Sequence, residues 1–252
     1  IAFWQFDTKG VRDFYLINNT DSLYPKIIPI QYPKVGERNS ACRIGVVSYS
    51  GGKVRWVQVP GDPRNHYIAR MDWAASSEEL VIQQLNRLQN TLKIMLADVD
   101  SGQVRTILTE RDEAWVDVHR DLHWLDEGNE FTWVSERDGW RHIYIGSRHG
   151  GEPRLLTVGD YDTGRSLGIQ GIDENNGWVY FMASPDNPTQ RYLYRVSLEG
   201  GKAKLVTPGE QKGTHSYQIS SDSRWAFHSY SSFDLPPVTE LVSLPDHKKI
   251  RT

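Results

Sequence analysis

The chain has 252 residues, 38% of them hydrophobic and 24% charged, which is typical of a globular protein of one or two domains. Its 29 basic and 32 acidic residues give a formal charge of −3, and the lack of a basic excess or stripe argues against a nucleic-acid partner. The single cysteine, Cys42, excludes an internal disulfide framework and a multi-cysteine metal site. The sequence contains no run of about 18 apolar residues, so it predicts no membrane span.

Taken in chain order, the predicted elements are almost all strands. The chain opens with an apolar strand at 1–6, and a long insert follows at roughly 18–40. Short runs rich in Val, Ile, Thr and aromatic residues then recur to the end of the chain, and such runs suit a pleated, half-buried surface. The best helix candidate, 76–88, contains Leu80-Val81-Ile82, which favours a strand. We therefore predict a nearly all-β protein.

A hairpin pattern repeats along the chain: an apolar strand, a turn that usually carries glycine, and a second strand. Four copies end about 48 to 50 residues apart, and a fifth copy is degenerate. The five copies are 43–59, 93–109, 142–157, 192–207 and 239–252. Glycine pairs at three of the turns suit a backbone with positive φ.

A second hairpin precedes each copy after the first, at 72–84, 123–135, 171–182 and 218–229. Two hairpins in each repeat of about 48 residues give four strands, which is the count and period of a β-propeller blade. One four-stranded sheet cannot cover its own apolar faces, so blades stack beside one another. We predict a partial β-propeller of about five antiparallel blades. They lie near 1–59 (incomplete, without its innermost strand), 68–109, 117–157, 165–207 and 215–252.

One polar segment, 115–121, is predicted to be the innermost strand of the third unit, and innermost strands line the central tunnel of a propeller. Strand alternation would place Asp117, His119 and Asp121 on one face and Arg120 on the other. Two interpretations remain open at this point. The segment is either a polar edge near the tunnel mouth or a site where His119 or Arg120 contacts a ligand.

The other motifs favour structural roles. Gly-x-Ser-x-Gly, His-Glu-x-x-His and phosphate-binding glycine loops do not occur, so the sequence predicts no catalytic residue, no metal site and no cofactor. The segment 135–140 is predicted to be a solvated turn or a local ion pair, and Arg141 and His142 begin the next strand. Cys42 is expected to be a small buried hydrophobic residue.

Several short motifs follow one another in a characteristic order. They are Ile1-Ala-Phe-Trp-Gln-Phe-Asp7, Leu23-Tyr-Pro25, Tyr32-Pro-Lys-Val-Gly36, Leu85-Asn-Arg-Leu-Gln-Asn90, Trp115-Val116 and Gly139-Trp-Arg-His-Ile-Tyr144. Together with the repeat period, they resemble the N-terminal propeller region of the dipeptidyl peptidase IV family, in the prolyl oligopeptidase class of serine peptidases. The resemblance runs over essentially the whole chain. It implies about five blades of an eight-bladed propeller that caps an α/β-hydrolase domain, whose serine, aspartate and histidine are expected beyond Thr252.

The resemblance also implies a function, a serine exopeptidase that releases N-terminal dipeptides after Pro or Ala, in which the propeller gates and positions the substrate. After the motif matched by Trp115-Val116, family members place side chains that face the substrate channel, and the matching positions are His119 and Arg120. Arg120 is expected to offer a charge-assisted hydrogen bond to a substrate carbonyl or carboxylate. The acidic pair that anchors the substrate amine lies upstream of the segment matched by 1–6, so Glu78 and Glu79 are not that pair.

Two rival functions stay open. The first is a non-catalytic propeller scaffold that binds protein partners. The second is a propeller glycosidase, for which Asp117 and Asp121 on one strand would lie roughly 13 Å apart, beyond the ~5–9.5 Å that such carboxylates need.

The resemblance implies three partners: a peptide substrate, the hydrolase domain of the same chain and a second copy in a homodimer. The chain begins at Ile1 without Met or a leader, which we interpret as an excised fragment. Its compartment is therefore open, with periplasm and cytoplasm both compatible.

Overall fold

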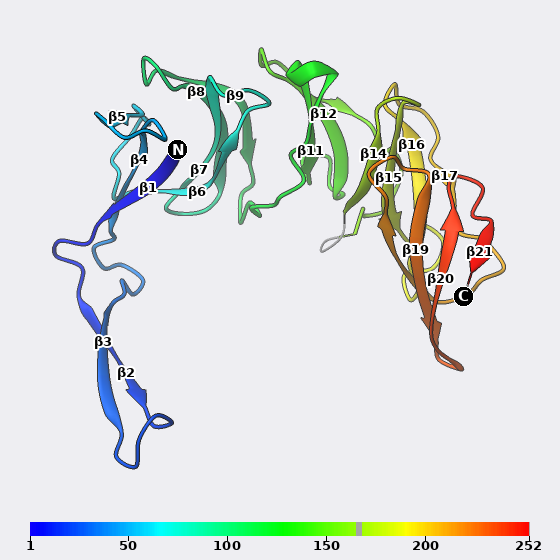
Figure 1. Ribbon diagram of the computed structural model, residues 1–252, viewed down its shortest axis with the longest axis horizontal. Coiled ribbons are helices and arrows are strands. Elements are labelled where there is room, and N and C mark those ends of the chain that lie inside the picture. The colour runs from blue at the N-terminus through cyan, green and yellow to red at the C-terminus, as the bar shows by residue number, and fades with distance from the viewer. Residues whose placement is uncertain (165–167, 252) are drawn as a thin grey trace. The chain divides into compact units, whose positions relative to one another are not determined.

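The computed structural model describes residues 1–164 and 168–251, and strands make up nearly all of its regular structure. A short 3-10 turn, Asp126–Gly128, is the only helical element in these ranges. The chain divides into two compact units, Ile1–Val118 and His119–Thr252. Both consist of antiparallel sheets, so the predicted all-β class is confirmed (Figure 1).

The first unit contains two sheets and a separate hairpin. The three-stranded sheet consists of β1 (Ala2–Asp7), β4 (Ala41–Val46) and β5 (Arg55–Trp56). The four-stranded sheet consists of β6 (His66–Trp73), β7 (Glu79–Asn86), β8 (Thr91–Asp98) and β9 (Val104–Arg111). The helix candidate at 76–88 is therefore largely strand β7, because its apolar run Leu80-Val81-Ile82 lies between two paired strands.

The separate hairpin is formed by β2 (Asp13–Asn18) and β3 (Lys26–Gln31), which pair only with each other. The insert predicted at roughly 18–40 therefore begins earlier, directly after β1. The reason is that the apolar strand β2 near the start of the insert pairs with the apolar strand β3 inside it. In Figure 1 the hairpin extends away from β1 and β4. Its side chains include Tyr15, Ile17 and Ile27, which are 64%, 72% and 70% exposed.

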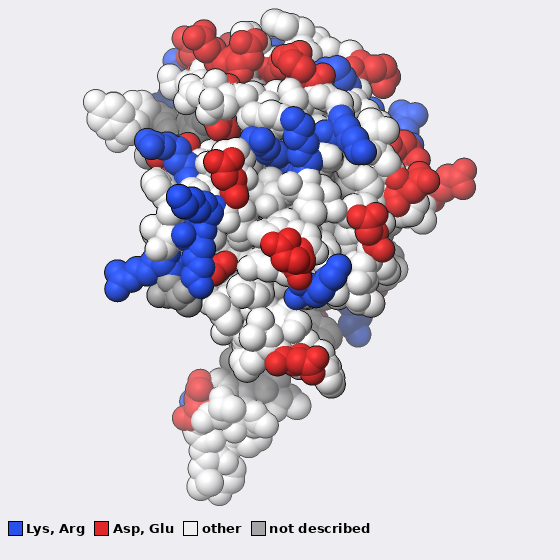
Figure 2. Space-filling model, turned by 90° about the vertical axis from the view of Figure 1, so that its right-hand side faces the viewer, with Lys and Arg blue, Asp and Glu red and all other residues white. Residues whose placement is uncertain are grey.

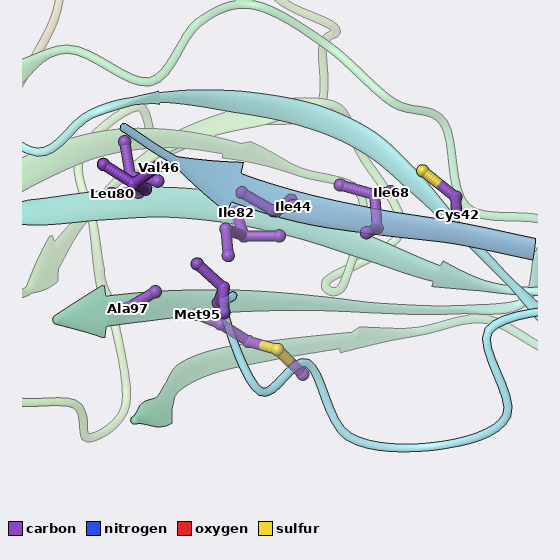
Figure 3. Close-up of a cluster of buried hydrophobic side chains, with 9 residues drawn as sticks. Cys42, Ile44, Val46, Ile68, Leu80, Ile82, Met95 and Ala97 are labelled. Carbon is purple, nitrogen blue, oxygen red and sulfur yellow. The ribbon is translucent and has the colours of Figure 1, made fainter. Parts of the chain in front are cut away.

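An apolar core fills the space between the two sheets of the first unit. It joins β4 to β6, β7 and β8 through side chains that point toward one another (Figure 3). Its labelled members are Cys42, Ile44, Val46, Ile68, Leu80, Ile82, Met95 and Ala97. Burial of apolar surface stabilises by about 25 cal/mol per Å², so this shared core holds the two sheets together. Cys42 is a buried member, and burial raises the pKa of its thiol to about 11.

The second unit contains three four-stranded antiparallel sheets, each in chain order. The first consists of β10 (Trp124–Leu125), β11 (Glu130–Ser135), β12 (His142–Ser147) and β13 (Arg154–Leu155). The second consists of β14 (Ile169–Asp173), β15 (Trp178–Ala183), β16 (Tyr192–Ser197) and β17 (Lys204–Leu205). The third consists of β18 (Thr214–Ile219), β19 (Trp225–Ser232), β20 (Leu235–Ser243) and β21 (Lys249–Arg251).

Strand β15 shows how these sheets depend on one another. Its residues Val179, Phe181 and Ala183 pack into the core shared with the β10–β13 sheet. The alternate residues Tyr180 and Met182 pack into the core shared with the β18–β21 sheet. Successive side chains of a strand point to opposite faces, so the middle sheet is covered on both sides. Four-stranded sheets stacked face to face are the blades of a partial β-propeller, as the repeat predicts.

The turns confirm the role predicted for the glycine pairs. Gly150 and Gly151, which connect β12 to β13, have φ values of +87° and +104°. Gly200 and Gly201 have the same left-handed backbone, at +92° and +105°. A tight hairpin turn needs positive φ at both central residues, which glycine adopts without steric cost.

The surface carries charges of both signs. On the face shown in Figure 2, groups of Lys and Arg side chains alternate with groups of Asp and Glu. This distribution agrees with the small net charge of −3. No helix among the described residues is both long and apolar enough to cross a membrane.

Candidate functional site

The segment that carries the predicted site residues is irregular. Residues 115–121 form no strand, and the innermost strand of the β10–β13 sheet is β10, which has only two residues. The prediction of an innermost strand over 115–121 is therefore wrong. Side chains divert the backbone there, since the Asp112 carboxylate accepts hydrogen bonds from the amides of Ala114 at 2.7 Å and Trp115 at 3.0 Å. Such a local carboxylate turn competes with strand pairing.

His119 is held inside the second unit, with 8% of its side chain exposed. Its Nε2 lies 2.8 Å from the carbonyl oxygen of Val134, and its ring centroid lies 4.1 Å from that of the buried Trp133. Its Nδ1 accepts a hydrogen bond from the amide of Asp121 at 3.2 Å. A carbonyl can only accept, so the imidazole is neutral with its proton on Nε2. Both ring nitrogens are thus used to fix this segment against β11.

Arg120 has the opposite environment, because its side chain is exposed. Among the described residues, none forms an ion pair with its guanidinium group. The structure therefore separates two neighbouring residues that the sequence placed in one site. His119 is anchored within the fold, while Arg120 presents a free guanidinium to solvent.

A buried ion pair holds Asp121, the last residue of the segment 115–121. Arg141 Nη2 lies 3.5 Å from Asp121 Oδ2, with 6% and 19% of the two side chains exposed. Burial raises the pKa of Asp121, and the positive charge of Arg141 opposes that rise. The Arg141 backbone is also fixed, since its carbonyl accepts hydrogen bonds from both the amide and the hydroxyl of Thr163 at 2.8 Å. Arg141 is therefore structural, as predicted.

The charged side chains of the turn at 135–140 have local partners, and Arg137 Nη1 lies 3.5 Å from Glu152 Oε2. His142 Nδ1 lies 2.8 Å from Asp138 Oδ2, and His142 is buried. Burial alone would raise the pKa of Asp138, but hydrogen bonds from His142 and from the amide of Trp140 outweigh it and lower that pKa. This contact links Asp138 of the turn to His142, the first residue of β12.

The carboxylates required by the glycosidase alternative are engaged locally. Asp117 accepts a hydrogen bond from the indole nitrogen of Trp115 at 2.9 Å and is exposed. Asp121 is paired with Arg141. Because the segment is not a strand, the predicted alternation of Asp117, His119 and Asp121 does not apply to it.

A second group of polar side chains was not predicted from the sequence. His228, Glu240 and His247 are buried in the β18–β21 sheet, and each offers a ligand-type atom within 4.8 Å of the others. Burial is the main cause that lowers the pKa of His228, to about 4, and also lowers the pKa of His215 and of His247. The three residues match no linear metal-binding motif. The available signal was the register of the β19–β20 hairpin, which places His228 opposite Glu240.

A family model supports the resemblance. The model described as the dipeptidyl peptidase IV N-terminal region matches residues 1–237. Among curated proteins, a probable dipeptidyl peptidase 4 of Emericella nidulans is 26% identical over 270 residues, covering 100% of this chain and 34% of that protein. A probable dipeptidyl-aminopeptidase B of the same species is 29% identical, covering 84% of this chain and 25% of that protein.

Solved structures agree with these matches. The crystal structure of Porphyromonas gingivalis dipeptidyl peptidase 4 is similar with a TM-score of 0.87 and 28% identity, over 100% of this chain and 35% of that one. A putative dipeptidyl aminopeptidase IV from Bacteroides ovatus has the same fold, with a TM-score of 0.83 and 22% identity, over 98% of this chain and 37% of that one. The chain thus spans about a third of the length of these two dipeptidyl peptidase 4 proteins.

Proposed function

Because the chain belongs to the family of dipeptidyl peptidase IV N-terminal regions, we propose that it is the substrate-gating and substrate-positioning propeller of a serine exopeptidase. The proposed enzyme releases N-terminal dipeptides after Pro or Ala. Matched relatives named dipeptidyl peptidase and dipeptidyl-aminopeptidase support the exopeptidase class. The stacked four-stranded sheets support the propeller, of which this chain supplies about five of eight proposed blades.

The proposed reaction is covalent acyl transfer, with a serine activated by histidine in an α/β-hydrolase domain of the same protein. In this scheme the propeller contributes exclusion and positioning. Holding the N-terminal end of a peptide in place decides which bond meets the serine, and it removes orientational freedom before the reaction.

The exposed guanidinium of Arg120 is the observation that carries the site proposal. It lies on a segment that cannot move freely, because His119 binds Val134 and Asp121 pairs with Arg141. A rigidly held cation can give a peptide carbonyl or carboxylate a charge-assisted hydrogen bond. We assign Arg120 as the substrate contact and His119 as the positioning residue that fixes it.

Kinetics of the full-length protein that contains this chain test the assignment. The change Arg120→Ala should raise KM for a Gly-Pro chromogenic substrate by about tenfold or more, since hydrogen bonds to charged groups contribute about 1.5–3 kcal/mol. The value of kcat and the thermal midpoint should change much less. Arg224→Ala, which removes an exposed arginine from the turn before β19, serves as the matched control and should leave KM unchanged. Equal KM values for wild type and Arg120→Ala would remove Arg120 from the site.

The non-catalytic scaffold remains the alternative function. A propeller can present its surface to protein partners without any chemistry. The same assay separates the two proposals, because a full-length protein that binds Gly-Pro substrates without turning them over would favour the scaffold. A Gly-x-Ser-x-Gly motif in the full-length sequence would favour the enzyme.

We also propose that the protein forms a homodimer through the β2–β3 hairpin. Both strands of this hairpin are edge strands, and apolar side chains on it are exposed to solvent. Exposed apolar edges favour association with another strand. A second copy presents the same edge and allows symmetric pairing.

A further inference from the structure

The β18–β21 sheet buries a row of polar residues on the face that packs against the β14–β17 sheet. Tyr217, His228 and Glu240 are directly opposite one another on β18, β19 and β20. Tyr217 and the neighbouring Ala226 and Val242 belong to the apolar core between the two sheets. The exposed fractions of His228 and Glu240 are 0% and 4%. The row is therefore in a dry environment, where every polar atom needs a partner.

The hydrogen bonds along this row decide where the protons of a neutral His215 and a neutral His228 lie. His215 Nε2 lies 3.0 Å from the carbonyl oxygen of Gln211, and a carbonyl can only accept, so Nε2 carries the proton of a neutral His215. His215 Nδ1 is then an acceptor, and the donor to it at 2.8 Å is His228 Nε2. A neutral His228 consequently has a bare lone pair on Nδ1. That lone pair lies 3.1 Å from Oε1 of Glu240, which is also an acceptor.

Two acceptors at this distance repel each other unless a proton or a metal ion lies between them. Two ligands of one tetrahedral Zn²⁺, each bound at about 2.0 Å, are separated by roughly 3.3 Å. The spacing of His228 Nδ1 and Glu240 Oε1 is therefore close to that of two ligands of one metal ion. The other oxygen of Glu240 lies 3.4 Å from Lys249 Nζ, so Oε1 remains available.

His247 lies beside these two residues, in the connection between β20 and β21. It is 8% exposed, and its ligand atom lies within 4.8 Å of those of His228 and Glu240. Its Nε2 lies 2.8 Å from the hydroxyl of Tyr217, which in turn lies 2.8 Å from the hydroxyl of Thr207. The Tyr217 hydroxyl can accept a hydrogen bond from Nε2 and donate one to Thr207, which leaves Nδ1 of His247 without a proton and able to bind a metal ion.

We propose that His228, Glu240 and His247 bind one divalent transition metal ion, of which Zn²⁺ fits best. Two imidazoles and one carboxylate are a ligand set that zinc accepts, with a fourth position for water, whereas Mg²⁺ and Ca²⁺ prefer oxygen ligands alone. His215 and Tyr217 orient the two imidazoles through their outer nitrogens, as metal-bound histidines normally require. The ion has a structural role, because it ties the last turn of the sheet to β19 and β20.

Metal titration of the full chain tests the proposal. After treatment with EDTA and exchange into metal-free buffer at neutral pH, calorimetry with Zn²⁺ should give one site per chain. Zn²⁺ should also raise the thermal midpoint, since a ligand that binds the folded state stabilises it, whereas Mg²⁺ should not. Co²⁺ should give the intense visible absorption of a four-coordinate site. All of these measurements use the wild-type protein, so their outcome does not depend on whether a variant folds.

Variants then assign the ligands. Glu240→Gln keeps the side-chain shape and should weaken Zn²⁺ binding by more than about 100-fold, while Tyr217→Phe, which removes a supporting hydroxyl, should weaken it by about tenfold. His149→Gln changes an exposed histidine outside the cluster and should bind Zn²⁺ like the wild type. The proposal is overturned if Zn²⁺ acts no differently from Mg²⁺, or if Glu240→Gln binds Zn²⁺ as tightly as the wild type. It is also overturned if nitrogen NMR finds a proton on both ring nitrogens of His228 and Zn²⁺ does not displace it.

Discussion

At the scale of single residues, the partners available to each side chain decide its role. His119 and Arg120 are adjacent in the chain, yet the first uses both ring nitrogens inside the fold and the second has an exposed guanidinium. His66 is a third example. It is 5% exposed at the start of β6, and the side-chain amide nitrogen of Gln84 lies 3.0 Å from its Nδ1. An amide nitrogen only donates, so His66 is an acceptor at Nδ1 and is neutral.

The buried His66 should make stability depend on pH. Burial lowers its pKa in the folded state, with the charge of Asp62 opposing the shift, while the unfolded chain titrates near 6.5. Below about pH 6.5 the unfolded state therefore binds more protons, and the free energy of unfolding falls as the pH decreases toward the folded-state pKa. Urea unfolding at several pH values should show a smaller decrease for His66→Gln than for wild type. The exposed His149→Gln is the control, and equal decreases for wild type and His66→Gln would refute the assignment.

At the scale of elements, the sheets depend on close cross-strand packing. Gly146 on β12 pairs with Phe131 on β11, and a Cβ atom on Gly146 would lie 2.5 Å from Cζ of the Phe131 ring. Phe131 is fully buried, so the ring has no free space into which it can move. The first sheet repeats this arrangement, with Gly45 opposite Phe3. A bare backbone in one strand thus accommodates an aromatic ring from the next strand.

Adding one methyl group to Gly146 should lower the stability of the folded protein. Gly146→Ala should lower the free energy of unfolding by about 1–3 kcal/mol, because overpacking forces neighbouring groups to shift. Gly209→Ala is the matched control, since its added Cβ would meet only Leu205 Cδ2 at 3.8 Å. Chemical denaturation measures both changes, and an unchanged m-value shows that the unfolded state is the same. A Gly146→Ala protein as stable as wild type would mean that β11 and β12 are less tightly packed than described.

Local sequence predicted the all-β class and the partial propeller, because apolar runs and glycine turns are properties of neighbouring residues. It failed at 115–121, where Trp115-Val116 resembles strand but the Asp112 carboxylate binds the backbone instead. It also missed the His228, Glu240 and His247 cluster. These residues meet only through the register of β19 and β20, which includes an irregularity between Tyr230 and Ser232. Such a register depends on tertiary packing and is not encoded in spacing alone.

At the scale of the whole molecule, the exposed β2–β3 hairpin should control association. Ile17 and Ile27 are paired across the hairpin and are 72% and 70% exposed. The double change Ile17→Lys and Ile27→Lys should convert a dimer into a monomer in light scattering, because a dimer interface would bury these charges. Tyr49→Lys changes an exposed aromatic residue outside the hairpin and should leave the dimer intact. A monomeric wild type, or a dimer that survives the double change, would contradict the proposed interface.

We propose that this chain is part of the propeller of an enzyme that removes two residues from the free N-terminus of a peptide. It is tested most directly by incubating the full-length protein with a peptide whose second residue is Pro, with its N-terminus either free or acetylated, and by identifying the products by mass spectrometry. The account predicts that the free peptide loses its N-terminal dipeptide and that the acetylated peptide stays intact. Cleavage of both peptides at similar rates, cleavage at internal bonds, or no cleavage of either peptide would contradict it.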